Sequence, residues 1–306
     1  MAGLASEYTQ SLDWLLAHNE PVVRYLALRD LVGLEPDDPE LLAARQLAHR
    51  QGPIANILNH MQPEGFWEKP GPGYGPKYRS TVWSITALAQ LGARLDEDDR
   101  VRAACAYVLD HALTARGQFT SSGAPSGTVD CLQGNLCWAL LEVGSRDDRL
   151  VPAIDWLARS VTGEGVAPVS EKDAALRYYS AKCGPNFACG ANANLPCAWG
   201  AVKVFLALGK VPTERRTPLI DRAIEQGVDF LLGIDPATGE YPHGWADKPS
   251  GNWWKFGFPV FYVTDVLQVV EALGALGLGG DARLTGTREL IAGKQDDHGR
   301  WPLEYD

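Results

Sequence analysis

The sequence lacks the features that mark a membrane protein or a nucleic-acid binder. No stretch reaches the 18 consecutive apolar residues of a membrane span, and the most apolar segment, residues 258–278, is interrupted by Asp265, Gln268 and Glu271. There is no basic run, and 28 Lys and Arg residues stand against 38 Asp and Glu residues, a net charge of −10. This balance argues against nucleic-acid binding and against a polybasic membrane anchor. Residues 1–20 carry no secretory or transit signal, so we expect a cytoplasmic protein.

Patterns typical of β-strands are nearly absent as well, and helical periodicity takes their place. Trp83, Ala87 and Leu91 recur at helical spacing, and Leu132 and Leu136 begin a second such pattern. The sequence therefore predicts an all-α protein.

The helices form a repeat. Each unit has an apolar helix that ends near a glycine, a turn that is acidic in most units, a second helix, and an ending in which most units place an aromatic residue after a glycine. A unit of this length holds two helices and their loops, so each is an αα-hairpin. The units span about residues 22–67, 80–119, 128–166, 195–241 and 258–301.

Twelve helices are expected in one domain over residues 1–306, with the apolar first helices inside and the more charged second helices outside. Three long insertions, at residues 67–79, 161–194 and 236–257, would emerge at one rim, where function is expected. The predicted helices lie near residues 7–18, 21–33, 38–50, 52–61, 79–91, 97–115, 129–143, 147–160, 195–208, 215–232, 259–276 and 281–294.

Two of the repeat endings carry a resemblance to a known family. The segments Gln62–Trp67 and Gln295–Trp301 resemble the Gln…Gly-x-Trp repeats, or QW motifs, of squalene–hopene cyclases. The chain from about Val22 to Trp301 is similar to the α/α-toroid superfamily that includes these cyclases and protein prenyltransferase β-subunits. The resemblance implies a single (α/α)6 toroid that acts on, or binds, an apolar, isoprenoid-like small molecule in its central cavity, with cyclase, lyase or transferase chemistry if it is an enzyme.

The catalytic motifs of that superfamily are matched poorly. Residues 96–99 read Asp-Glu-Asp-Asp, like the Asp-x-Asp-Asp of class II terpene cyclases, but their place in the repeat predicts helix capping. Prenyltransferases of this fold hold zinc with an Asp, a Cys two residues later and a distant His. Here Cys131 directly follows Asp130, and Val263 occupies the expected position of the His. Ordinary protein prenylation is therefore not expected.

Asp265 is the leading candidate for a catalytic acid. A helix starting at Pro259 would place it on one face with Phe261 and Gln268, in an apolar wall that raises its pKa and lets it donate a proton. The alternative is an ion pair with Arg24 or Arg79.

Asp130 and His243 are further candidates for the catalytic site. Asp130 would orient the substrate at the rim, or else cap the helix it begins. His243 would act as a ligand or as an acid–base group, or else pack among loop aromatics.

Four cysteines, at positions 131, 183, 189 and 197, concentrate near the same rim. One reading makes Cys131, Cys183 and Cys197, with His243, the ligands of a zinc ion in an enzyme of thiol or alkyl transfer. The other reading is a set of small buried thiols.

Aromatic and basic residues at the rim are the candidates for substrate binding. A wall of aromatic faces suits a polyprenyl chain or a cation, although part of it is expected to be helix core. A third function is a toroid that binds a ligand without catalysis. The candidate binding residues are Tyr78, Arg79, Trp83, Trp199, Trp253, Trp254, Phe258, Phe261 and Tyr262.

Overall fold

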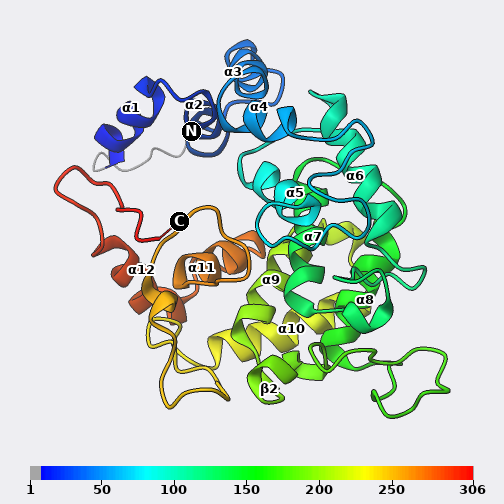
Figure 1. Ribbon diagram of the computed structural model, residues 1–306. Coiled ribbons are helices and arrows are strands. Elements are labelled where there is room, and N and C mark those ends of the chain that lie inside the picture. The colour runs from blue at the N-terminus through cyan, green and yellow to red at the C-terminus, as the bar shows by residue number, and fades with distance from the viewer. Residues whose placement is uncertain (1–7, 306) are drawn as a thin grey trace.

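The computed structural model describes residues 8–305 and confirms the predicted all-α class (Figure 1). Within these residues there are twelve α-helices and two strands of two residues each. No helix among them is long and apolar enough to cross a bilayer. The helices are α1 (Thr9–Ala17), α2 (Pro21–Leu26, continued by a π-helical segment, Ala27–Val32), α3 (Pro39–Arg50), α4 (Gly52–Asn59), α5 (Thr81–Gln90), α6 (Asp99–His111), α7 (Asp130–Glu142), α8 (Leu150–Thr162), α9 (Ala198–Gly209), α10 (Pro218–Leu232), α11 (Val266–Ala275) and α12 (Thr285–Ala292). The strands β1 (Ala188–Cys189) and β2 (Leu195–Pro196) pair antiparallel.

Acidic residues in the turns cap the helices, as predicted. Asp38 accepts a hydrogen bond from the Glu40 amide at 2.8 Å at the start of α3. Asp98 does the same for the Arg100 amide at 2.9 Å at the start of α6. The Asp-Glu-Asp-Asp segment is therefore a capping turn, and Arg100 beside Asp98 helps to lower the pKa of that carboxyl.

One predicted helix begins much later than expected. Helix α11 starts at Val266 instead of residue 259, because the backbone ahead of it is bound elsewhere. The Gln90 side chain holds both the amide and the carbonyl of Val260, at 2.8 and 2.5 Å, and Asn135 donates to the carbonyl of Phe261 at 3.0 Å. Asp265 is the N-cap of α11 and accepts a hydrogen bond from the Gln268 amide at 3.0 Å. The prediction that Asp265 lies within the helix is wrong.

Helices α5 and α9, which open two of the hairpins, are buried almost all round. Eight of the ten residues of α5 and ten of the twelve of α9 are buried, whereas α3 buries only four of twelve. Helix α5 packs against α7, α7 against α9, and α9 against α11, while α8 packs against α10 on the other side. One hydrophobic cluster extends from Val22 to Leu284. Polar side chains on the buried helices must therefore find partners inside the protein.

The closing turns of the hairpins share one design. In the turns at residues 62–66, 114–118 and 296–300, the first amide donates to the fifth carbonyl at 2.8 Å. Three aromatic residues then donate to a carbonyl ten residues earlier, in the last turn of the preceding helix: Trp67 to Ile57, Tyr241 to Leu231, and Trp301 to Ile291. These bonds add a second partner to the carbonyls of Ile57 and Ile291, which also accept from the amides of His60 and Lys294 at 3.2 Å, and a partner to that of Leu231 at the open end of its helix.

Each of the first two turns is also tied to the next hairpin. The Trp67 amide donates to Thr81 Oγ1 of α5 at 3.1 Å, and the Phe119 amide donates to Gln133 Oε1 of α7 at 2.5 Å. The glycine of the second turn, Gly117, has φ +84° and lies so close to α8 that an added Cβ would meet the Pro152 carbonyl oxygen at 2.2 Å. Only glycine fits this contact.

We predict that Gly117→Ala lowers the free energy of unfolding by about 2–5 kcal/mol, because it adds left-handed strain to a clash with the backbone of α8. Gly123→Ala is the matched control, since Gly123 has φ +78° but no atom closer than 4.0 Å to an added Cβ. That control should cost about 1–2 kcal/mol. Urea unfolding of both variants checks the prediction, and equal losses would contradict the close approach.

Candidate functional site

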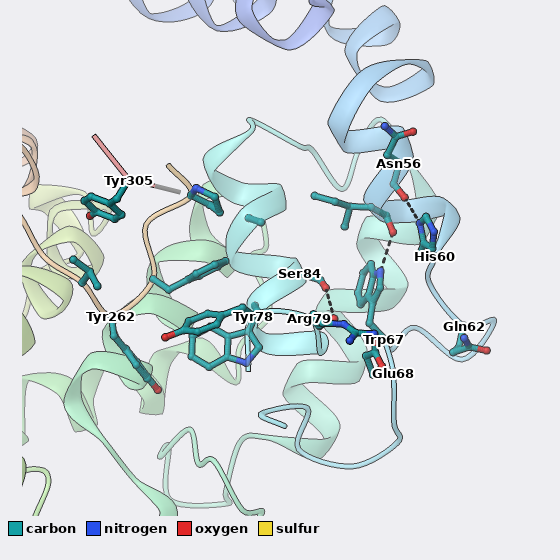
Figure 2. A pocket seen from close by; sticks show the side chains of 16 residues that line it. Asn56, His60, Gln62, Trp67, Glu68, Tyr78, Arg79, Ser84, Tyr262 and Tyr305 are labelled. Atoms are coloured by element: carbon teal, nitrogen blue, oxygen red, sulfur yellow. Dashed lines mark hydrogen bonds and ion pairs between the residues drawn. The ribbon is translucent and has the colours of Figure 1, made fainter. Parts of the chain in front are cut away.

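A cleft of about 1070 Å³, here called the aromatic cleft, lies between α4, α5 and two loops. Figure 2 shows Tyr262 and Tyr305 on one side of it and Trp67, Glu68 and Arg79 on the other. Five of the predicted binding residues line it, namely Tyr78, Arg79, Trp83, Phe261 and Tyr262. The structure thus brings together residues that are up to 184 positions apart in the sequence.

Four aromatic rings form the wall of the aromatic cleft. Tyr78 stacks on Phe261 with ring centroids 5.5 Å apart, and Trp83 meets Phe261 and Tyr262 edge-on at 5.3 and 5.2 Å. The Trp83 indole donates to the Tyr74 carbonyl at 2.8 Å, which fixes its ring. Tyr78 is 56% exposed, so a face of this wall remains open to a ligand.

The polar edge of the aromatic cleft is held by local contacts. Arg79 forms an ion pair with Glu68 at 2.7 Å, and His60 Nδ1 contacts the Asn56 carbonyl at 2.8 Å. Arg24, in contrast, pairs with Glu40 at 2.5 Å. Neither arginine pairs with Asp265, so the predicted ion pair of that residue is wrong.

A bent loop, residues 257–264, separates the aromatic cleft from a second cavity of about 440 Å³. We call this stretch the dividing segment. Pro259 and Phe261 line the aromatic cleft, whereas Phe258 and Val260 line the second cavity. Phe258, predicted to bind substrate with the other aromatics, therefore lies on the opposite side of this segment from Phe261.

The C-terminal residues described pair with the dividing segment. The Glu304 amide donates to the Phe256 carbonyl at 2.7 Å, and the Phe258 amide donates to the Tyr305 carbonyl at 3.4 Å. Tyr305 lines the aromatic cleft, and its buried hydroxyl has no hydrogen-bond partner among the described residues. Burial and the nearby Asp265 raise the pKa of Tyr305 to about 12.

Asp265 lies in the second cavity and not in the aromatic cleft. Its side chain is 1% exposed, and burial raises its pKa, against the hydrogen bonds from Gln268. The amide of Gln268 donates from Nε2 to Asp265 Oδ2 at 3.0 Å and accepts at Oε1 from the Lys203 ammonium. The raised pKa of Asp265 agrees with the prediction from the sequence. Its position does not, because Asp265 lines the second cavity and not the aromatic wall.

Lys203 is the functional candidate that the sequence analysis missed. It lies in the middle of α9, is 1% exposed, and burial lowers its pKa to about 8. The available signal was its position, because Lys203 is the only charged residue of α9, Ala198–Gly209, which is otherwise apolar. A charge on such a helix must be paired or used.

Asp130 lies away from both cavities, beside the cysteines. It is the first residue of α7, whose N-cap is Val129, so the predicted capping role is wrong. Its Oδ1 accepts a hydrogen bond from Ser160 Oγ at 2.9 Å, and burial raises the pKa of Asp130 to about 8. Asp130 is thus a neutral buried acid near neutral pH.

The cysteines of this region lie close together as free thiols. An added Cβ on Gly200 would lie 3.9 Å from both Cys131 Sγ and Cys197 Cβ, and the Cys197 thiol lowers the pKa of Cys189. Nevertheless, no group of three or more His, Cys, Asp or Glu residues within 8–305 is arranged to hold a metal ion. The predicted zinc ligands Cys131, Cys183 and Cys197 therefore receive no support from the geometry.

The remaining predicted residues lie outside both cavities. The indoles of Trp253 and Trp254 donate to the carbonyls of Pro236 and Ala237 at 2.8 Å, which fixes the loop ahead of them. Trp199 packs against the hydrophobic core. His243 is half-buried in a loop whose neighbouring residue, Gly244, donates its amide to Asn192 Oδ1 at 2.9 Å.

Comparison with known proteins gives no match: neither a protein-family model nor a curated protein is significantly similar to this chain.

We predict that Asp130→Asn stabilises the protein increasingly as the pH rises from about 4 to 8. The Asp130 carboxyl ionises near pH 4 in the unfolded chain but near pH 8 in the folded protein, so it lowers the free energy of unfolding by up to about 1.4 kcal/mol per pH unit in this window. Below pH 4 both states are protonated and the residue has no such effect.

Urea unfolding of the wild type and the variant at pH 4, 6 and 8 measures this difference. Asp99→Asn is the control, because the Asp99 side chain is 98% exposed. A gain in the free energy of unfolding of Asp130→Asn that is independent of pH would contradict the raised pKa of the buried Asp130 carboxyl.

Proposed function

We propose that this chain is a single (α/α)6 toroid, similar to the superfamily of squalene–hopene cyclases and prenyltransferase β-subunits, and that it binds an apolar, isoprenoid-like small molecule in the aromatic cleft. The proposal is supported by the repeated closing turns and by the aromatic wall. The wall is the observation that carries the function.

The contacts of the closing turns support the ring. An added Cβ on Gly65 would meet the Ala103 carbonyl oxygen of α6 at 2.7 Å, and Gly117 makes the corresponding approach to α8. In the last turn, Gly299 approaches α1, although there an added Cβ would meet a side-chain atom, Ser11 Oγ, at 2.8 Å. Helix α1 therefore takes, for the last hairpin, the place that α6 and α8 take for the first two.

Two further contacts support closure between the ends of the described chain. Ser11 Oγ donates to the Gly299 carbonyl at 2.8 Å, and the Arg300 guanidinium lies 4.2 Å from the centre of the Trp14 ring. In Figure 1 the helices follow one another around the molecule in chain order, which agrees with a ring. A closed ring encloses a central space, and the aromatic cleft and the second cavity would be its two parts.

The chemistry of the aromatic cleft favours a largely apolar ligand. Its wall offers the ring faces of Tyr78, Trp83, Phe261 and Tyr262, and the basic group at its edge, Arg79, is already neutralised by Glu68. Such a surface binds hydrocarbon and aromatic groups by burial and ring contacts. A polyanion finds no unpaired cation among these lining residues.

Binding is the better supported part of the proposal, and catalysis on the bound molecule is the weaker part. Asp265, the predicted acid, faces the second cavity, and the dividing segment separates it from the aromatic cleft. This placement favours the alternative of a toroid that holds its ligand in the aromatic cleft without acid catalysis there.

We predict that farnesol, an isoprenoid alcohol, binds the protein and that Tyr78→Ala weakens this binding about tenfold, which corresponds to about 1.4 kcal/mol. Tyr78 offers an exposed ring to the ligand, so its loss removes one stacking surface and leaves the buried core intact. Isothermal titration calorimetry measures the dissociation constants.

Tyr179→Ala serves as the control, because Tyr179 lies outside the aromatic cleft and stacks under Arg177. Absence of farnesol binding to the wild type would overturn the proposed ligand class. Equal affinities of the two variants would overturn the assignment of the aromatic cleft.

A further inference from the structure

We propose that the second cavity binds a small aldehyde or ketone and that Lys203 forms an imine with it. This site lies on the other side of the dividing segment from the aromatic cleft and is independent of farnesol binding. The proposal rests on three side chains: the buried amine of Lys203 at the cavity wall, the amide of Gln268 to which it is hydrogen-bonded, and the carboxyl of Asp265 to which that amide donates.

The amine of Lys203 faces the cavity without a carboxylate partner. Lys203 lines the cavity from α9, and among the described residues it takes part in no ion pair. Its hydrogen bond goes to the neutral Oε1 of Gln268. Buried lysines are usually paired, so a lysine kept without a counter-charge at a cavity is a candidate for chemistry.

The other charged groups of the cavity largely neutralise one another. Glu142 forms ion pairs with Arg29 at 3.4 Å and with Lys210. Arg29 also pairs with Asp30 at 2.6 Å. The titratable and charged groups around Lys203 are Arg29, Asp30, Cys131, Glu142, Lys210, Asp265 and Glu271.

Burial also prepares the amine for nucleophilic attack. Desolvation lowers the pKa of Lys203 to about 8, whereas an ordinary lysine has a pKa near 10.4. Near neutral pH, a fraction of Lys203 on the order of one tenth is therefore the free amine, compared with less than one thousandth for an exposed lysine. Only the free amine attacks a carbonyl carbon.

The Gln268 side chain is hydrogen-bonded both to the Lys203 amine and to the Asp265 carboxyl, the acid of the proposed reaction. Its Oε1 accepts from the Lys203 ammonium, and its Nε2 donates to Asp265 Oδ2 at 3.0 Å. Burial raises the pKa of Asp265, so this carboxyl holds a proton more readily than an exposed one. The three side chains therefore place a nucleophile and an acid on one wall of the cavity.

The reaction needs no co-reactant beyond the carbonyl compound. The lone pair of Lys203 Nζ forms a C–N bond as the C=O π bond breaks, and the proton that the nitrogen then loses passes to the oxygen to give a carbinolamine. The C–O bond then breaks with a proton from Asp265, water leaves, and the nitrogen returns one proton to the Asp265 carboxylate. One amine and one carbonyl compound thus give one imine and one water.

The size and the mouth of the cavity define the ligand. About 440 Å³ accommodates a compound of a few carbon atoms, and Phe258 and Leu267, 43% and 42% exposed, form an apolar mouth beside the exposed Glu271. A small aldehyde or ketone fits this volume, with its carbonyl group toward the polar wall and its hydrocarbon part toward the apolar mouth.

The test is reductive trapping of the native protein with butanal and cyanoborohydride, which converts an imine into a stable butyl adduct. Peptide mass spectrometry then compares Lys203 with Lys210, an internal reference directly after the same helix whose side chain is 37% exposed. At pH 7.5 we expect Lys203 to be modified at least tenfold faster than Lys210. Its rate should reach half of its maximum near pH 8.

Lys203→Met should lose this fast adduct, and the wild-type comparison stands even if that variant does not fold. Modification of Lys203 at the same rate as Lys210 or slower would overturn the proposal. So would an adduct on Lys203 that forms only after unfolding in urea.

Discussion

The structure depends on one constraint: its central helices are buried on all sides, so each polar group on them must be satisfied inside the protein. Thr81 on α5 and Gln133 on α7 hold the turns that close the preceding hairpins. Gln90 and Asn135 hold the dividing segment, and Lys203 reaches Gln268. An unpaired polar group at such a position would cost on the order of 1–3 kcal/mol, so these bonds position the loops and thereby shape both cavities.

The helices and their caps could be predicted from the sequence because both depend on local rules. A capping side chain ahead of the first turn and apolar residues at helical spacing account for α3, α6 and α10 to within four residues, and α3 and α10 also begin with a proline. The start of α11 could not be predicted in this way. The residues that keep its predicted first turn unwound, Gln90 and Asn135, are 170 and 126 positions distant from their partners.

The site was predictable in part for the same reason. Composition pointed to the aromatic residues near positions 78–83 and 258–262, and five of the nine predicted binding residues do meet in one cleft. Trp253 and Trp254 were predicted to bind substrate but do not line this cleft. Their indole N–H groups donate to carbonyls of the loop ahead of them, and composition does not reveal such bonds. Lys203 was not predicted, because the sequence does not show whether a single lysine in an apolar helix points to solvent or into the protein.

The position of the dividing segment between the two cavities has a consequence for synthesis on the ribosome. Trp83 and Tyr78 emerge early, but the rings that cover them, Phe261 and Tyr262, follow about 180 residues later. At a translation rate of roughly 5–20 residues per second, the aromatic wall stays uncovered for about ten seconds or more. During that time the nascent chain exposes a surface attractive to chaperones, and the wall and both cavities take shape only when residues 257–264 arrive.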